Sequence, residues 1–270
     1  IWLSPMYKSP NDDNGYDISD YQDIMEEFGT MEDFNHLLSE VHKRGMKLIL
    51  DLVVNHTSDE HPWFIESRSS KDNPKRDWYI WADPKPDGSE PNNWESIFNG
   101  STWEYDDTTK QYYFHLFSKK QPDLNWSNPD VREAVFKMMN WWFEKGIDGF
   151  RVDAITHIKK TFEAGDLPVP KGKQYAPAFD VDMNQPGIQD WLQEMKDKSL
   201  SHYDIMTVGE ANGVNPDNAK EWVGEKEGKF NMIFQFEHLG LWSTGDSKFD
   251  VLSYKNVLNR WQKQLEGIGW

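Results

Sequence analysis

The feature that most constrains the fold of this 270-residue chain is its alternation of short apolar runs with segments of helical periodicity. Met46–Val54 (MKLILDLVV) is almost continuously apolar, which is typical of a strand covered on both faces. Before it, Thr30 and Asp33 form a capping-box pattern that predicts a helix start. The apolar residues of that helix share one face: Phe34, Leu37, Leu38 and Val41. Strands and helices in this order form right-handed parallel βαβ units.

The pattern recurs along the chain, starting from an interior strand. The expected strands are Ile1–Met6, Met46–Val54, Ile147–Val152, Ile205–Val208 and Met232–Phe236. Further helices are expected from Asn128 to Gly146, over Ile188–Lys198, near Asn218–Gly224 and over Val251–Leu265. No Gly-rich phosphate-binding turn follows a strand, which disfavours a doubly wound sheet. We therefore expect an α/β fold, a (β/α)8 TIM barrel that is incomplete here and holds about strands 2 to 6.

A segment of about 70 residues between Thr57 and Trp126 interrupts the alternation. It is rich in Trp, Asn, Asp and Pro, and Gln111–Phe117 has a strand-like pattern. Unstructured loops of this length are rare in compact domains, so an inserted subdomain is expected after strand 3. The predicted divisions are 1–56 (barrel strands 2 and 3), 57–126 (subdomain) and 127–270 (barrel strands 4 to 6 and the following helix).

Composition excludes several classes of partner. The formal net charge of −17 leaves no basic surface for nucleic acid. No apolar run reaches the length that crosses a membrane. The absence of cysteine weakly favours a cytoplasmic location, although the N-terminal part of the protein is expected to be missing. The 14 Trp residues indicate flat apolar platforms that suit sugar rings, although many of them are expected to fill the core.

Polar residues stand at the ends of three expected strands, where an apolar core would not select them. Arg151 and Asp153 lie two residues apart on one strand, so their side chains point to the same face. Burial in the helix layer would cost several kcal/mol, so both are expected to point into the mouth of the barrel. Glu210 and His56 end two other strands and should face the same cavity. Asp51 is expected to hold loops by hydrogen bonds, and His56 could instead cap the loop after its strand.

A retaining glycosidase requires a carboxylate that attacks the anomeric carbon and a carboxylic acid that protonates the leaving oxygen. Arg151 beside Asp153 is expected to keep that nucleophile ionised. Glu210 has no cationic neighbour in sequence, so it is expected to stay protonated and act as the acid. Each carboxylate taken alone could be structural, because barrels also carry structural carboxylates.

At these residues the sequence resembles glycoside hydrolase family 13, the α-amylase superfamily. The matching motifs are DLVVNH (51–56), QPDLNW (121–126), GFRVDAI (149–155) and VGEAN (208–212). Similarity to the oligo-1,6-glucosidase and α-glucosidase subgroup rests on GYDISDY (15–21), PNNWESIF (91–98) and YDIMTVGE (203–210). The resemblance covers essentially the whole chain, as an internal fragment of a catalytic domain.

The resemblance implies a role for individual residues. Asp153 would be the nucleophile and Glu210 the general acid/base. The residues implied in binding the nonreducing-end glucose are Asp13, Tyr16, His56, Phe98, Phe117 and Arg151. A third catalytic Asp is expected beyond the C-terminus, so the fragment alone is expected to be inactive and poorly stable. No cofactor is expected, and any structural calcium site would lie in the missing N-terminal part.

Linkage preference depends on Ala154, where the resemblance associates Val with α-1,6 activity and a smaller residue with α-1,4 activity. We therefore expect a retaining exo-acting α-glucosidase that acts on maltose and short malto-oligosaccharides. The alternatives are an oligo-1,6-glucosidase, a trehalose-6-phosphate hydrolase and a non-catalytic glucosidase-like ectodomain. The only basic pair near the pocket, Lys159 and Lys160, is expected to be solvated surface charge. The expected partner is a small oligosaccharide, and the sequence does not indicate an oligomeric state.

Overall fold

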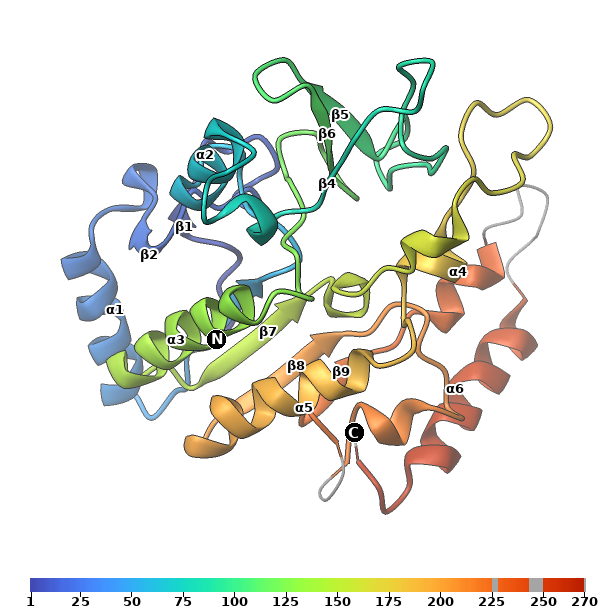
Figure 1. Ribbon diagram of the computed structural model, residues 1–270. Coiled ribbons are helices and arrows are strands. Elements are labelled where there is room, and N and C mark those ends of the chain that lie inside the picture. The colour runs from blue at the N-terminus through green and yellow to red at the C-terminus, as the bar shows by residue number, and fades with distance from the viewer. Residues whose placement is uncertain (225–227, 243–249, 270) are drawn as a thin grey trace.

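A parallel sheet forms the centre of the computed structural model, which describes residues 1–224, 228–242 and 250–269. Its order is β3-β7-β8-β9. The strands are β3 (Leu50–Val53), β7 (Gly149–Asp153), β8 (Met206–Glu210) and β9 (Met232–Phe234). Within this sheet, each strand lies beside the one that precedes it in sequence order, and the order never reverses. The sheet is therefore part of a (β/α) barrel, as predicted from the sequence (Figure 1).

Helices follow these strands in the expected order. The longer ones are α1 (Met31–Lys43), α3 (Pro129–Lys145), α5 (Ile188–Lys198) and α6 (Val251–Leu265), and the shorter ones are α2 (Pro62–Ser69) and α4 (Phe179–Asp182). Short 3-10 turns lie at Glu26–Phe28, Arg76–Trp78, Ile155–His157, Phe162–Ala164, Leu200–His202, Ala219–Glu221 and Glu237–Trp242. In the described ranges, no helix is both long enough and apolar enough to cross a membrane.

Capping residues start and stop the helices where the sequence predicts. Thr30 and Asp33 form the complete capping box of α1. Asn128 caps α3, with Pro129 at its first turn, and Gly146 ends that helix in the left-handed conformation. The apolar face of α3 includes Trp142, whose side chain is fully buried and whose Nε1 donates to the Tyr21 carbonyl at 2.8 Å. This contact ties α3 to a hairpin of β1 (Tyr7–Lys8) and β2 (Asp20–Ile24).

A separate antiparallel sheet lies between β3 and α3 in the chain. Its order is β4-β6-β5, formed by Trp81–Ala82, Gln111–Phe114 and Trp103–Asp106. It has its own small apolar core around Trp94, Trp103 and Phe114. Figure 1 shows this sheet above the carboxyl end of β7. The division of the chain at residues 57 and 126 stays a prediction.

Three local predictions were wrong. The expected strand Ile1–Met6 is reduced to one parallel bridge between Trp2 and Ile49, because Pro5 lacks an amide hydrogen and the chain then turns to pair β1 with β2. Leu37 is 42% exposed, on the edge of the α1 apolar face. The helix expected at Asn218–Gly224 is only a 3-10 turn, because Val223 leaves it to bridge Phe230.

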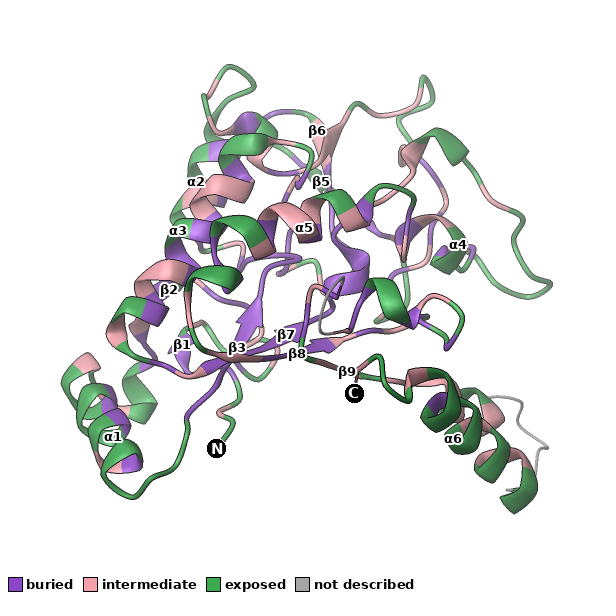
Figure 2. Ribbon diagram, turned by 90° about the horizontal axis from the view of Figure 1, so that it is seen from below, coloured by how far each residue is buried: buried purple, intermediate pink, exposed green. Residues whose placement is uncertain are grey.

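Burial follows the layers of the sheet and its helices (Figure 2). Every residue of β3 and β7 is buried, which explains why their sequences are apolar apart from three charged residues, Asp51, Arg151 and Asp153. By contrast α6 is largely exposed, with Trp261 as its buried residue. The charged side chains of β3 and β7 therefore require partners inside the protein.

Gly149 allows β7 and β8 to approach closely. It has φ +146°, and a Cβ at this position would lie 1.7 Å from the Met206 carbonyl oxygen. We predict that Gly149→Ala lowers the free energy of unfolding of the full-length protein by about 3 kcal/mol or more, because strain and overlap add together. Gly100→Ala is the control: φ is +82° but the space is open, so about 1 kcal/mol is expected. Equal losses in urea unfolding would contradict this prediction.

Candidate active site

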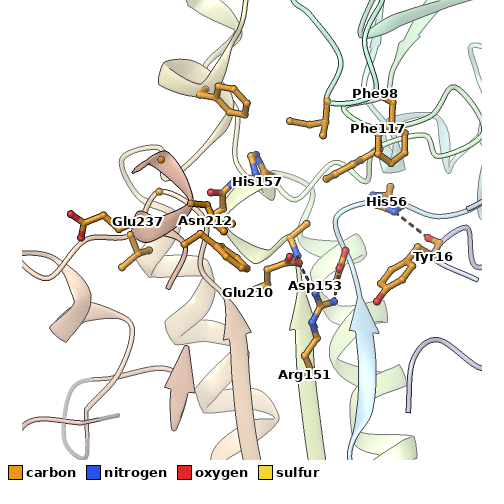
Figure 3. A pocket seen from close by; sticks show the side chains of 18 of the residues that line it. Tyr16, His56, Phe98, Phe117, Arg151, Asp153, His157, Glu210, Asn212 and Glu237 are labelled. Carbon is orange, nitrogen blue, oxygen red and sulfur yellow. Dashed lines mark hydrogen bonds and ion pairs between the residues drawn. The ribbon is translucent and has the colours of Figure 1, made fainter. Parts of the chain in front are cut away.

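A cavity of about 960 Å³ opens at the carboxyl ends of β3, β7 and β8. All nine residues singled out from the sequence line it: Asp13, Tyr16, His56, Phe98, Phe117, Arg151, Asp153, Ala154 and Glu210. Figure 3 shows that Arg151, Asp153 and Glu210 converge at its base, with Tyr16 and His56 on one side and Phe98 and Phe117 above. Barrel strands that end at one face bring these distant residues together.

Arg151 is the centre of the ionic contacts at the base of the cavity. Its Nη1 lies 2.5 Å from Asp153 Oδ1 and 3.0 Å from Asp51 Oδ1. Its Nη2 lies 2.8 Å from Glu210 Oε2. Burial acts against the charge of Arg151, but the three carboxylates outweigh burial and raise its pKa. One cation therefore serves three carboxylates, and the cluster retains excess negative charge.

The pKa of Asp153 is raised, contrary to the expectation that Arg151 would dominate. Burial of the side chain is the largest cause, and the charges of Glu210 and Asp51 raise the pKa further. Arg151 opposes these effects without cancelling them, because its charge is shared with Glu210 and Asp51. The sequence revealed the neighbour two residues away but not the competing carboxylates.

Glu210 also differs from the expectation, because Arg151 is its cationic neighbour. Its Oε2 accepts a hydrogen bond from the Ala154 amide at 3.0 Å and forms an ion pair with Arg151 Nη2 at 2.8 Å. Among the described residues, none donates a hydrogen bond to Oε1. These two contacts at Oε2 therefore orient the carboxyl group of Glu210.

Ala154 adopts a left-handed conformation, with φ 43° and ψ 30°. Non-glycine residues rarely adopt this region, at a cost of order 1–3 kcal/mol. The conformation directs its amide toward Glu210 Oε2 and ends β7 immediately after Asp153. The backbone after β7 therefore links the positions of the two carboxylates.

Tyr16 and His56 form a connected wall on the β3 side. The Tyr16 hydroxyl donates to Asp51 Oδ2 at 3.2 Å, and His56 Nε2 lies 3.1 Å from the Tyr16 carbonyl oxygen (Figure 3). Burial lowers the pKa of His56, so the neutral ring is favoured. Asp13 joins this wall through Gln121, whose Nε2 donates to Asp13 Oδ2 at 2.9 Å. Asp51 was expected only to hold loops, but it also pairs with Arg151.

The segment between β3 and α3 supplies two aromatic residues that lie above His56 (Figure 3). Phe98 is 50% exposed and meets the Phe117 ring edge-on, with centroids 5.7 Å apart. Phe117 also packs against His56, with ring centroids 5.1 Å apart. An exposed aromatic ring at the mouth of a polar cavity is suited to contact the apolar face of a sugar.

Sequence reasoning missed other residues that line the cavity. These are Ile97, His157, Phe179, Asn212, Gly213, Val214, Asn215, Phe236, Glu237, Leu239 and Gly240. His157 and Asn212 lie within four residues of Asp153 and Glu210, so position after a strand end was a usable signal. Phe179 in α4 had no such signal, because its place depends on how a long loop folds back.

The residues in the described ranges contain no cluster of three or more His, Cys, Asp or Glu side chains that could hold a metal ion. The acidic residues at the base of the cavity are neutralised in part by a guanidinium group, whose position 2.5–3.0 Å from Asp153 and Asp51 fills the space between them. The geometry thus supports acid, base and nucleophile chemistry by carboxylates.

The sequence matches one family model over residues 1–270, described as alpha amylase, catalytic domain. It is 64% identical to a probable oligo-1,6-glucosidase 3 from Bacillus subtilis (strain 168). This match covers the whole of the present chain and 49% of the relative. It is 50% identical, again over its whole length and 49% of the relative, to an alpha-glucosidase from Pediococcus pentosaceus. The chain therefore spans about half the length of these curated relatives.

Solved structures show the same fold. A trehalose-6-phosphate hydrolase from Bacillus licheniformis matches with a TM-score of 0.91 and 46% identity, over 100% of this chain and 49% of that one. An isomaltulose synthase variant from Erwinia rhapontici NX5, in complex with its natural substrate sucrose, matches with a TM-score of 0.92 and 42% identity, over 100% and 48% of the two chains.

The shared cation predicts an unusual dependence of stability on pH. Burial raises the pKa of Asp51 from 3.8 to about 6 despite Arg151. The folded protein then binds an extra proton between these values, so stability falls as pH rises from 4 to 6, by roughly 3 kcal/mol from this group. We predict that Asp51→Asn flattens this fall in the free energy of unfolding, measured by urea titration of the full-length protein.

Asp148, at the other end of β7, is the matched control. Burial favours its neutral form, but hydrogen bonds from Lys47, the Leu48 amide and His42 outweigh burial and lower its pKa. Its contribution is therefore present above its ordinary pKa of 3.8 and is lost only at lower pH. Asp148→Asn should leave the slope between pH 4 and 6 unchanged. An equal slope in the wild type and Asp51→Asn would contradict the prediction.

Proposed function

This chain belongs to the α-amylase family of glycoside hydrolases (family 13), and from that premise we propose that the full-length enzyme is a retaining exo-acting α-glucosidase. It would release terminal nonreducing α-1,4-linked glucose from maltose and short malto-oligosaccharides. The observation that carries the proposal is the bridge formed by Arg151 between Asp153 and Glu210 at the base of one cavity. Such a pair supplies a nucleophile and an acid on neighbouring strands.

Double displacement assigns a separate step to each carboxylate. Asp153 attacks the anomeric carbon while Glu210 Oε1 gives its proton to the departing glycosidic oxygen. The bond between glucose and the leaving sugar breaks, and an ester bond forms between Asp153 and glucose. Glu210 then takes a proton from water, which attacks the same carbon and releases Asp153. Two inversions at one carbon retain the α configuration.

The shared Arg151 supports the change in the role of Glu210. Before reaction, Arg151 is shared between the two carboxyl groups, with Nη1 2.5 Å from Asp153 Oδ1 and Nη2 2.8 Å from Glu210 Oε2. Once Asp153 becomes a neutral ester, it no longer competes for the charge of Arg151. Glu210, next to this guanidinium, then serves as the base.

The wall formed by Tyr16, His56 and Asp13 on the β3 side is proposed to hold the nonreducing-end glucose. Asp13 and His56 would hydrogen-bond its hydroxyl groups, and Tyr16 would contact its ring. Phe98 and Phe117 would close the pocket from above, as their place over the cavity suggests (Figure 3). The proposed partner is thus a small neutral oligosaccharide, and a cytoplasmic location is proposed from the lack of cysteine.

Ala154 supports the choice of an α-1,4 linkage. It follows Asp153 directly and lines the cavity, so a larger side chain there would reduce the space for the leaving sugar. A second candidate, α-1,6 activity, is favoured by the names of several relatives, including an oligo-1,6-glucosidase from Parageobacillus thermoglucosidasius with 58% identity. Maltose and isomaltose distinguish the two candidates.

A phosphorylated substrate is less well supported. Lys160 was expected to be solvated, but it is buried against Asp123, and Lys159 lies over the Trp191 ring at 4.4 Å. Among the described residues that line the cavity, Arg151 is the one Lys or Arg, and four carboxylates line it: Asp13, Asp153, Glu210 and Glu237. A non-catalytic ectodomain is also less well supported, because both carboxylates are kept in contact with Arg151.

We predict that Asp153→Asn in the full-length enzyme lowers kcat for maltose by at least about 10³-fold, because the attacking carboxylate is lost. Asp148→Asn, which removes a carboxylate from the other end of β7, should change kcat little. Proton NMR of the wild-type reaction should show α-glucose as the first product. First release of β-glucose would exclude double displacement, and an active Asp153→Asn would exclude this nucleophile.

For linkage, we predict that the wild type has a higher kcat/KM for maltose than for isomaltose, and that Ala154→Val shifts this ratio toward isomaltose. Because Val is strained in the left-handed region, the Ala154→Val variant should also have a lower free energy of unfolding. Ala154→Gly is the control, because Gly adopts this conformation freely and adds no bulk. Its ratio should stay on the maltose side. A wild type that prefers isomaltose would overturn the α-1,4 assignment.

A further inference from the structure

Lys160 carries a buried ammonium group that the proposed reaction does not use. It follows β7, and its side chain is only 1% exposed. Its Nζ contacts Asp123 Oδ2 at 2.5 Å and Asn55 Oδ1 at 2.9 Å. A buried charge is tolerated only with close partners, so these two contacts hold the ammonium in one position.

The ammonium, together with its partner Asp123, determines how the Asn55 amide is oriented. An ammonium only donates hydrogen bonds, so the carbonyl oxygen of the amide must face Lys160. The amide nitrogen of Asn55 then faces the other way, toward His56 Nδ1 at 3.2 Å and Asp123 Oδ2 at 3.0 Å. Both hydrogens of that nitrogen are used.

The orientation of Asn55 in turn determines the tautomer of His56. Because the amide nitrogen donates, His56 Nδ1 must accept and carries no proton. The proton is then on Nε2, which donates to the Tyr16 carbonyl oxygen at 3.1 Å. The Gln121 amide nitrogen, 3.2 Å from the same Nε2, donates instead to Asp13 Oδ2 at 2.9 Å. A chain of hydrogen bonds thus runs from Lys160 through Asn55 and His56 to Tyr16, and the last two line the cavity.

The second oxygen of Asp123 extends this arrangement to the aromatic residues above His56. Asp123 Oδ1 accepts from the Leu116 amide at 2.8 Å, next to Phe117 in the chain. Asp123 also bridges His56 through the backbone. The ammonium therefore links Asn55, next to His56 in the chain, with Asp123, whose other oxygen holds the residue before Phe117.

From these contacts we propose that Lys160 is a positioning residue that sets the Nε2–H tautomer and the orientation of His56 in the glucose-binding wall. It acts through Asn55 and does not touch the substrate. The proposal rests on the proposed function only for its kinetic consequence. The tautomer is a property of the protein alone and is observed without any substrate.

The direct test is ¹⁵N NMR of the His56 ring in the full-length enzyme. The wild type should show the Nε2–H form. In Lys160→Met, the Asn55 oxygen loses its donor and Asp123 loses the cation that holds its carboxylate in place, so the amide is no longer held in one orientation and the Nδ1–H form should appear. Lys159→Met is the matched control, because this neighbour contacts Trp191 and not Asn55. An unchanged tautomer in folded Lys160→Met would overturn the proposal.

Asn55→Asp provides a second test that retains the Lys160–Asp123 pair and decides if Lys160→Met does not fold. It replaces the donor that faces His56 Nδ1 by an acceptor, so a proton should move onto Nδ1. His56 faces Asp13, Asp123 and Lys160 as charged groups, and the ammonium disfavours its charged form. Protonation should therefore begin at higher pH in both variants, and a titration identical to the wild type in both would overturn the proposal.

Kinetics test the consequence for the substrate. We expect kcat/KM for maltose to fall about tenfold or more in Lys160→Met, mainly through KM, because the wall is misplaced while the carboxylates are untouched. Lys159→Met should stay within about twofold of the wild type. A tautomer change with unchanged kinetics would overturn the role of Lys160 in the glucose wall. A wild type inactive on α-glucosides would overturn the proposed function alone, since the ring spectra do not depend on activity.

Discussion

The ion cluster around Arg151 is the interaction on which the rest of the site depends. A single buried guanidinium contacts Asp51, Asp153 and Glu210. Three carboxylates cannot be fully stabilised by one cation, and burial raises the pKa of both Asp51 and Asp153. The excess negative charge destabilises the fold near neutral pH but leaves the carboxylates poised to exchange protons. Buried carboxylates with shifted pKa values are common at sites where a protein carries out chemistry.

The cluster requires a particular alignment of the strands. Asp51 lies directly beside Arg151 in the β3–β7 pair, and Arg151 lies beside Val208 in the β7–β8 pair. A shift by one residue would turn these side chains to the opposite face of the sheet. Gly149 permits the close approach at the start of β7, and the left-handed Ala154 ends it. The charged residues and the backbone features of β7 therefore form one unit.

A second buried cation plays the corresponding part for the walls of the cavity. Lys160 joins the end of β3 to the antiparallel sheet region through Asn55 and Asp123. Arg151 organises the base by charge, whereas Lys160 organises the wall by the direction of its hydrogen bonds. Both belong to the segment from β7 onward, so one strand and its following loop position most of the polar groups around the cavity.

The sequence alone determined four of the five expected strands, the main helices and their caps, because these depend on periodicity and on neighbours a few residues apart. It also indicated Asp153 and Glu210, since charged residues at the ends of apolar strands have few places to point. Only the tertiary structure decided that Arg151 also serves Glu210, that Lys160 is buried, and that Phe179 lines the cavity. These depend on contacts between residues far apart in the chain, such as Lys160 and Asn55, which are 105 positions apart. Strand register and loop packing bring such residues together, and neither leaves a local pattern in the sequence.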